Sequence, residues 1–325
     1  MTFSIVIPTY NGADYVEQSI ISAIGQTRPA DEIIVSDDNS KDNTLEICYR
    51  YADKVKIFKN SLGPSGFVNG WKKAIDHSSC EYISVLHQDD LLKPNFLEEV
   101  ERALCSNPDV KHIFVPCELI DENNDIIQSA SVSNGKVVRY TGIDYVKAYQ
   151  HIGHPHIHRC PGVVTHRDIF KKCHYRPDAG HIADDDFFYR VGQYTDVLGI
   201  LIPLAQYRQH GKSETGHLDD IILIQRLIKD YNFQLDHLHE NNAFDDESKS
   251  YFRNWMLRLI EMELVNAIRS NNENVFLEYL KHCNLLEKYN LRKTRKMIIF
   301  ECFVHVIGME ITHKFIDRLY GMMNK

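Results

Sequence analysis

The sequence predicts an α/β protein with a mixed, mostly parallel sheet flanked by helices, followed by a helical C-terminal region. Strand-like and helix-like segments alternate with short linkers over about the first 120 residues, which is typical of a parallel sheet covered on both faces. Beyond residue 217, apolar residues recur at helical spacing in long segments. We therefore expect an α/β domain at 1–216 and a helical region at 217–325.

The elements follow from local patterns along the chain. A short, nearly continuous apolar run, typical of a strand buried on both faces, predicts a strand at 4–8, and further strands are predicted at 31–37, 54–60, 82–86 and 112–121. Apolar residues at three- and four-residue spacing predict helices at 13–26, 41–53, 66–77 and 94–108. The stretch 121–203, rich in His, Gly and Pro, is expected to be irregular. Four helices are expected after it, at 218–239, 246–270, 274–288 and 291–323.

Composition limits the functional classes. The chain is 43% hydrophobic and 25% charged, as in a folded domain with a sizeable core. Its formal charge is 37 − 45 = −8, which argues against nucleic-acid binding. None of the eight cysteines is spaced as CxxC, so we expect free thiols in a reducing compartment. No signal peptide or membrane-spanning run is recognised, and we expect a cytoplasmic protein.

Polar loops follow three of the expected strands: "TYNG", "SDDNS" and "HQDDLLKP". Since parallel strands end at one edge, these loops are expected to line a ligand site there. Asp89 and Asp90 would repel each other unless a cation or hydrogen-bond donors lie beside them. One interpretation is a divalent-metal site, and the alternative is a turn or helix start in which Asp caps free amides.

Five segments together resemble the motifs of inverting glycosyltransferases of family 2 with the GT-A fold. They are "SIVIPTYNG", "EIIVSDDNSKDNT", "NSLGPSGFVNG", "EYISVLHQDDLLKP" and "ADDDFFYRV". The resemblance covers about the first 215 residues and implies transfer of a sugar from a nucleotide-sugar with Mn²⁺ or Mg²⁺. A later segment, "LAQYRQHGKSETG", is similar to the rhamnosyltransferase-like branch. Inversion at the anomeric carbon rests on the resemblance alone.

The resemblance assigns nucleotide contacts near the first two strands. Pro8, Thr9 and Tyr10 would lie against the base and ribose, although Tyr10 could instead pack as an edge aromatic. Asp38 would accept the N3–H of uracil or thymine, which implies a UDP- or dTDP-sugar donor. The alternative role for Asp38, capping the next helix, suits Ser40 or Asp42 better.

Asn69 is implied as a further donor contact, but the chain departs from the family beside it. Val68 stands where many relatives have Arg, and Lys72 or Lys73 could supply the missing charge. In the acidic motif, His87 stands where many relatives have another Asp.

The resemblance also assigns the metal and diphosphate contacts. Asp90 would bind the metal, while Asp89 would lie nearer the ribose and the donor sugar. Arg208 would contact the diphosphate, and His210 is either a metal ligand or an ordinary packed residue.

The catalytic base of the family is an Asp six residues before an Arg. Counting back from Arg190 gives Asp184, with Asp185 and Arg190 as secondary candidates. Ala183 replaces the Glu usual in the family. The alternative is that the three successive acids only stabilise a helix N-terminus.

Two segments admit several interpretations. Histidines crowd residues 151–181, where "GHPHIHRC" could form an acceptor-binding loop, a plain polar loop or, less favourably, a zinc site. In the last expected helix, cations precede an apolar run at 297–309, so it could lie on the inner face of the cytoplasmic membrane or pack in a helical core.

The resemblance thus implies an enzyme that transfers a sugar to a saccharide acceptor, expected to be lipid-linked, in surface polysaccharide synthesis such as O-antigen or capsule. A sugar nucleotidyltransferase would need a glycine-rich, arginine-bearing loop after the first strand, and "PTYNGADY" has one glycine and no arginine. A catalytically silent nucleotide-sugar-binding relative is the other alternative, disfavoured by Asp38, Asp90 and Asp184.

Overall fold

The computed structural model describes residues 1–325 except 130–135, 143, 146–157, 212–219, 238–245 and 315–325. Two compact units are distinguished, Met1–Gly211 and Lys212–Lys325. The division lies close to the boundary expected at 216/217. The two units are described separately below.

The first unit is built around four parallel strands in the order β3-β2-β1-β4. They are β1 (Phe3–Thr9), β2 (Glu32–Asp37), β3 (Lys56–Lys59) and β4 (Tyr82–Val85). The connecting helices are α1 (Val16–Ile24), α2 (Thr44–Tyr49), α3 (Phe67–Asp76) and, after β4, α4 (Phe96–Ser106). Each was predicted from its apolar pattern. All seven residues of β1 are buried, as expected for a central strand.

The sheet continues past β4 with strands of both directions. β6 (His112–Ile120) runs parallel to β10 (Val197–Ile200), which pairs antiparallel with β8 (Val137–Tyr140). Three short strands, β5 (Leu91–Leu92), β7 (Ile126–Gln128) and β11 (Ala205–Arg208), attach around the end of β6. β9 (His158–His166) lies between β4 and β6 and is antiparallel to both.

The prediction that 121–203 is irregular is therefore wrong. Besides β7 to β10, this stretch holds α6 (Arg167–Lys172), a 3₁₀ helix (Pro177–Ile182) and α7 (Ala183–Val191). β9 was missed because Pro161 and Gly162 normally indicate a break in a strand. Gly162 is needed here, since a Cβ on it would lie 2.5 Å from the backbone oxygen of Val115 on β6.

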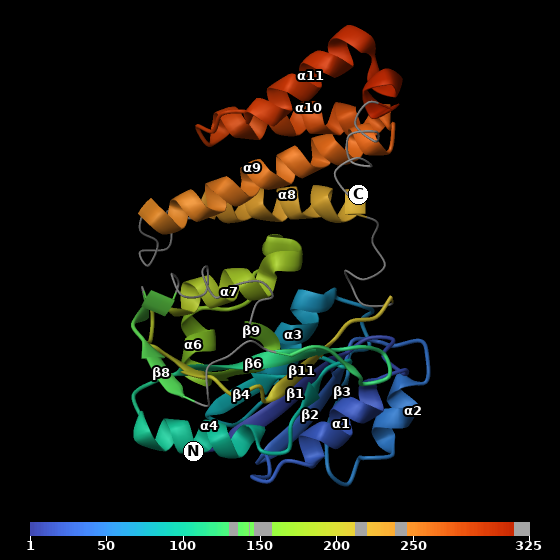
Figure 1. Cartoon of the computed structure of the whole chain (residues 1–325). Coiled ribbons are helices and arrows are strands. Elements are labelled where there is room, and N and C mark those ends of the chain that lie inside the picture. The colour runs from blue at the N-terminus through green and yellow to red at the C-terminus, as the bar shows by residue number, and fades with distance from the viewer. Residues whose placement is uncertain (130–135, 143, 146–157, 212–219, 238–245, 315–325) are drawn as a thin grey trace. The chain divides into compact units, whose positions relative to one another are not determined.

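One large apolar cluster fixes the ends of the strands. Helices α1, α2 and α4 cover one face of the sheet, and α3, α6 and α7 cover the other (Figure 1). On the first face, Ile5 and Ile7 of β1 pack in one cluster with Ile20 of α1 and Phe96 of α4. Each such fully buried side chain stabilises the fold by about 1.5–3 kcal/mol. The edge that follows β1, β2 and β4 is therefore built on a rigid support.

The second unit consists of helices. They are α8 (Asp220–His237), α9 (Asp246–Arg269), α10 (Glu273–Lys288) and α11 (Arg295–Ile307). The helix predicted at 291–323 begins at Arg295, where Thr294 caps it, and is interrupted at Gly308, at φ +81°; residues 309–314 are helical again, and the predicted remainder lies outside the described residues. Among the helices that the structure describes, none is both long and apolar enough to cross a bilayer.

Glu32 is a buried carboxylate at the start of β2 that ties three strands together. It accepts from the Ser4 hydroxyl at 2.7 Å, the Ser79 backbone N–H at 2.9 Å, and the Lys56 ammonium at 2.6 Å. Burial alone would raise the pKa of Glu32, but these donors lower it to about 2. Because the pKa is lower in the folded state, the stabilisation is complete above about pH 4.5 and is lost as the pH falls toward 2.

We expect Glu32→Gln to lower the free energy of unfolding by about 1–3 kcal/mol at pH 7, since a charge-assisted hydrogen-bond acceptor is lost. Urea denaturation at pH 7, 4 and 3 should show the difference from wild type shrinking as the pH falls. Glu81→Gln, which changes a half-exposed carboxylate, is the control and should cost less than about 0.5 kcal/mol. A difference that stays constant from pH 7 to 3 would contradict this role for Glu32.

Candidate active site

The polar segments after β1, β2 and β4 lie at one edge of the sheet, because these strands are parallel. The central feature is His87–Asp90, which we term the acidic turn, directly after β4. Its backbone is held by side chains from other elements. The Ser19 hydroxyl of α1 lies 2.8 Å from the carbonyl oxygens of both Gln88 and Asp90, and Arg208 Nε donates to that of Asp89 at 2.8 Å. Three successive carbonyls are thus fixed.

The side chain of Gln88 joins the acidic turn to the end of β1. Its amide oxygen accepts from the Tyr10 N–H at 2.8 Å, and its amide nitrogen donates to the Tyr10 carbonyl at 3.1 Å. Gly12 leaves room for this amide, since a Cβ there would lie 2.2 Å from Gln88 Oε1. Gln88 therefore fixes the segment that carries Thr9 and Tyr10 beside the turn that carries Asp89 and Asp90.

The side chains of the acidic turn form a cluster suited to a divalent cation. Ligand atoms of His87, Asp89 and Asp90 all lie within 4.8 Å of one another, and His210 Nε2 lies 3.0 Å from Asp89 Oδ2. Asp90 is 1% exposed, and its Oδ1 accepts from the Arg208 backbone N–H at 2.9 Å. His87 Nε2 is buried without a hydrogen-bond partner among the described residues. Carboxylate and imidazole ligands fit Mn²⁺, and carboxylates fit Mg²⁺.

The electrostatics favour ligand-competent forms of these groups. Burial would raise the pKa of Asp89, but the hydrogen bond from His210 keeps it below the usual value. Burial lowers the pKa of His87, against the opposing effect of Asp89, and so favours the neutral imidazole. Ionised carboxylates and neutral imidazoles are the forms that bind metals.

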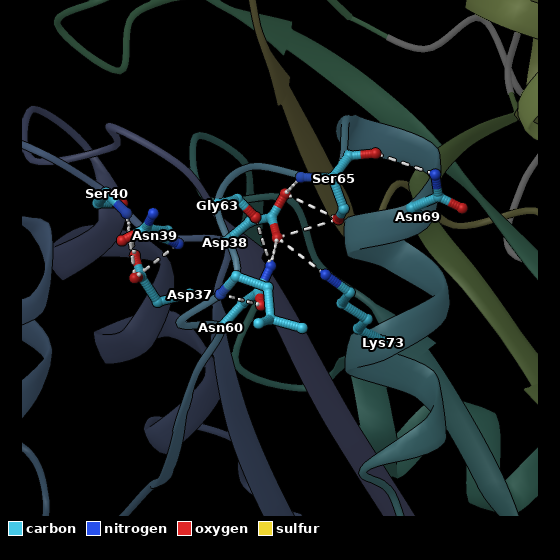
Figure 2. Close-up of polar contacts among 10 residues, drawn as sticks. Asp37, Asp38, Asn39, Ser40, Asn60, Gly63, Ser65, Asn69 and Lys73 are labelled. Carbon is cyan, nitrogen blue, oxygen red and sulfur yellow. Dashed lines mark hydrogen bonds and ion pairs between the residues drawn. The ribbon is translucent and has the colours of Figure 1, made fainter.

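Asp38, the predicted base-reading residue, lies just beyond β2 and is 6% exposed. Its carboxylate accepts from Asn60 Nδ2 at 2.6 Å and from the backbone N–H and hydroxyl of Ser65, and Lys73 Nζ lies 3.3 Å away (Figure 2). Burial alone would raise the pKa of Asp38, but these donors hold it below its ordinary value. Of the two lysines considered for the missing charge, Lys73 is the one near Asp38, while Lys72 pairs with Asp76.

The neighbouring polar residues of this region have local roles. Asp37 accepts from the backbone N–H groups of Asn39 and Ser40, away from the carboxylate of Asp38 (Figure 2). Asp42 accepts from the Thr44 N–H at the start of α2, so capping does not require Asp38. Asn69 donates to the Ser65 carbonyl at 2.9 Å and steadies the first turn of α3 (Figure 2).

The three acids of α7 differ in their surroundings. Asp186 is fully buried and pairs with Arg190, whose Nε lies 2.9 Å from it and whose Nη2 also donates to the His174 carbonyl. Arg190 therefore anchors α7 internally. Asp184 and Asp185 are half-buried in the first helical turn, where the helix dipole favours negative charge. The Asp185 N–H donates to Asp184 Oδ1 at 3.0 Å.

Two observations connect α7 with the acidic turn. Burial strongly raises the pKa of the Cys160 thiol on β9, and the charges of both Asp184 and Asp90 raise it further. Aromatic rings also bridge the elements. Trp71 of α3 stacks on His87 at 4.9 Å and meets the ring of Tyr175 edge-on at 5.2 Å, and Tyr175 lies 4.5 Å from the ring of Phe187 on α7.

This aromatic bridge was not predicted. A second ring of α3, Phe67, stacks on His181 of the 3₁₀ helix at 5.7 Å. The signal available in the sequence was the i, i+4 spacing of the aromatic pair Phe67 and Trp71 in "GFVNGW", but its partners are distant in sequence.

The remaining predicted residues are placed as follows. Pro8 and Thr9 end β1 and are buried, and Thr9 Oγ1 has no hydrogen-bond partner among the described residues. Tyr10 is 44% exposed, as a stacking residue would be. Arg208, predicted at the diphosphate, is 1% exposed. The histidines within 151–157 lie outside the described residues, and of the candidate ligands in "GHPHIHRC" His158 and Cys160 fall on β9.

The sequence model of glycosyl transferase family 2 matches residues 4–172, slightly more than half of the chain. This chain belongs to glycosyltransferase family 2. An uncharacterized glycosyltransferase of Rickettsia typhi is 41% identical over 123 residues, which cover 37% of this chain and only 38% of that relative's own length. An uncharacterized glycosyltransferase of Haemophilus influenzae is 27% identical over 325 residues, covering 95% of this chain and 88% of that relative.

The structure of residues 1–349 of Staphylococcus aureus TarS in complex with UDP superimposes with a TM-score of 0.64 at 13% identity. The superposition covers 99% of this chain and 92% of that chain. At this identity the likeness concerns the fold, and it confirms the predicted GT-A class: a mostly parallel sheet flanked by helices, with a helical C-terminal region.

The contact between Gly12 and Gln88 gives a test of how this family 2 site is assembled. We expect Gly12→Ala to displace the Gln88 amide and to weaken nucleotide binding about tenfold, with a loss of stability of about 1 kcal/mol. If displacement of Gln88 is the cause, Gly12→Ala should have almost no further effect in a Gln88→Ala background. Additive effects in this double-mutant cycle, measured by calorimetric titration and urea unfolding, would mean that Gly12 acts otherwise.

Proposed function

We propose that this protein transfers a sugar from a UDP- or dTDP-sugar to a hydroxyl group of a saccharide acceptor, assisted by Mn²⁺ or Mg²⁺. The observation that carries the proposal is the placement of the acidic turn and His210 in one cluster, which ring contacts connect to α7, the helix that carries Asp184. Donor activation needs a cation site, and acceptor activation needs a base nearby. Because the chain belongs to family 2, sugar transfer is the reaction that would use both the cation site and the base.

The proposed nucleotide site runs from Tyr10 to Asp38. The exposed ring of Tyr10 can stack on a base, which contributes about 1–3 kcal/mol in comparable sites. The carboxylate of Asp38 is an acceptor for the N3–H of uracil or thymine, a donor that cytosine lacks. Since its oxygens already accept from Asn60 and Ser65, one of these contacts must yield to the base. The TarS structures with UDP and with UDP-GlcNAc support a uracil nucleotide.

The proposed cation site uses Asp89 and Asp90, with His87 and His210 as nitrogen ligands. A bound divalent cation would neutralise charge on the diphosphate leaving group. Asp90 was predicted as the principal ligand, yet one of its oxygens is engaged by the Arg208 backbone. One oxygen of Asp89 is likewise engaged, by His210 Nε2, so the two carboxylates are equal candidates.

We propose Asp184 as the general base. In the transfer, the acceptor hydroxyl gives its proton to the Asp184 carboxylate while its oxygen forms the new bond to the anomeric carbon. The bond from that carbon to the diphosphate oxygen breaks on the opposite side, and the nucleoside diphosphate leaves, which inverts the configuration. Asp186 is unsuited because it is fully buried and paired with Arg190, and Asp185 is the remaining alternative.

For the acceptor we propose a lipid-linked saccharide of a surface polysaccharide, such as O-antigen or capsule, at the inner face of the cytoplasmic membrane. Support comes from α11, on which Ile298 and Val306 are 49% and 80% exposed. The exposed cations Arg292 and Arg295 lie at its start, as suits an anionic surface.

A catalytically silent relative would bind the nucleotide but release no product.

Calorimetric titration with UDP, dTDP and GDP, with and without Mn²⁺, tests the donor site. We expect one uracil or thymine nucleotide to bind, and to bind more tightly with Mn²⁺. Asp89→Asn and Asp90→Asn should each reduce the gain in nucleotide affinity that Mn²⁺ gives by more than tenfold, because a carboxylate ligand is lost. Asp53→Asn, an exposed acid after α2, is the control and should bind as wild type does. If wild type binds none of the three nucleotides, the proposed function fails.

Release of nucleoside diphosphate from a panel of UDP- and dTDP-sugars tests the base. Asp184→Asn should lower turnover about 10²- to 10⁴-fold, as expected for loss of a general base, and leave nucleotide affinity within about twofold of wild type. Asp185→Asn is the matched control one residue away and should lose less than about tenfold. If Asp185→Asn lost more turnover than Asp184→Asn, Asp185 would be the base instead.

A further inference from the structure

We infer that Arg208 is a positioning residue, which holds the acidic turn in its cation-binding shape and does not contact the donor's phosphates. The inference rests on the proposed function, because it concerns the same site. It departs from the role in diphosphate binding that the family resemblance predicts for Arg208.

The guanidinium group of Arg208 is enclosed by three segments that are far apart in the sequence. Besides Nε to the Asp89 carbonyl, Nη1 donates to the Asp121 carbonyl at 2.9 Å. Nη2 donates to Gln18 Oε1 of α1 at 2.9 Å and to Asn124 Oδ1 at 2.7 Å. Arg208 is thereby bonded to the acidic turn, to the turn between β6 and β7, and to α1.

These contacts leave little of the side chain for a ligand. The ring of Tyr15 lies under the guanidinium at 4.8 Å, and only 1% of Arg208 is exposed. An arginine that grips phosphate usually presents two parallel N–H groups to it. Here Nε, Nη1 and Nη2 all donate to uncharged oxygens of the protein. A phosphate oxygen could reach Arg208 only after several of these bonds were broken.

The backbone of Arg208 adds a second hold on the acidic turn. Its N–H donates to Asp90 Oδ1 at 2.9 Å, while its side chain holds the adjacent Asp89 carbonyl. The position of Arg208 is itself fixed, since β11 pairs with β6 up to Ile120. Arg208 therefore sets both the backbone of the turn and the orientation of one carboxylate. Cation sites demand such preorganisation, because ligands must converge within a few tenths of an ångström.

The turn between β6 and β7 belongs to the same arrangement. Asn124 adopts φ +72°, in the left-handed region that Asn tolerates, and Asp121 Oδ1 accepts from the N–H of Asp125. This conformation brings the Asn124 amide oxygen to Arg208. Cation affinity should therefore depend on Asn124 and Gln18, although neither belongs to the cation cluster.

The test measures Mn²⁺ binding without nucleotide, by electron paramagnetic resonance of free Mn²⁺, and UDP binding without metal, by calorimetry. We expect Arg208→Gln and Arg208→Lys to bind Mn²⁺ at least tenfold more weakly and to keep metal-free UDP affinity within about threefold. The opposite pattern, unchanged Mn²⁺ affinity with weakened metal-free UDP binding, would overturn the inference and favour direct phosphate contact.

Variants of the residues that accept hydrogen bonds from Arg208, together with a control, separate this role from an effect on overall stability. Asn124→Ala and Gln18→Ala each remove one hydrogen bond to Arg208 and should weaken Mn²⁺ binding about threefold, even where an Arg208 variant fails to fold. Arg28→Gln changes another largely buried arginine, bonded to Asp31 and Glu101, and should lower the melting temperature without changing Mn²⁺ affinity.

Two further outcomes would decide against the inference. If wild type binds Mn²⁺ and the Asn124, Gln18 and Arg208 variants bind it with the same affinity, only the role of Arg208 is refuted. If wild type binds neither Mn²⁺ nor UDP, the proposed function fails and the inference fails with it.

Discussion

The site depends on one electrostatic constraint: two adjacent carboxylates, Asp89 and Asp90, must be held side by side after a buried strand. Like charges at this distance repel unless donors or a cation compensate them. The protein fixes the backbone of the turn with Ser19 and Arg208 and gives each carboxylate its own partner, His210 for one and the Arg208 N–H for the other. The residual repulsion is then balanced by bonds already formed within the fold.

The parallel sheet makes this arrangement possible. β1, β2 and β4 end at one edge, so segments separated by dozens of residues deliver Tyr10, Asp38 and the acidic turn to the same place. The apolar cluster beneath α1 and α4 keeps that edge rigid, and α1 in turn supplies Ser19 to the turn. Helix packing and site geometry are coupled through α1: its apolar face is buried in the core, and its polar residues hold the acidic turn.

How far the sequence predicts this structure depends on how local the signal is. The strands β1 to β4 and β6 and the helices α1 to α4 have apolar patterns of their own, and they were predicted, whereas the two-residue strand β5 was not. β9 was missed because Pro161 and Gly162 mask a strand whose partners, β4 and β6, lie far away in sequence. The carboxylates were predicted from motifs, but the burial of Arg208 and the stack of Trp71 on His87 arise from tertiary contacts that no local pattern encodes.

The three acids of α7 show why chemistry needs more than a motif. The motif selects Asp184 from three successive carboxylates by spacing alone, and only packing shows how their surroundings differ. Asp186 faces inward and is neutralised by Arg190, whose further bond to the His174 carbonyl locks the helix against the preceding segment. With one acid committed to structure, the helix can keep Asp184 half-exposed at its N-terminus, where the dipole favours the ionised form that a base requires. A buried ion pair thus fixes the helix on which the proposed base stands.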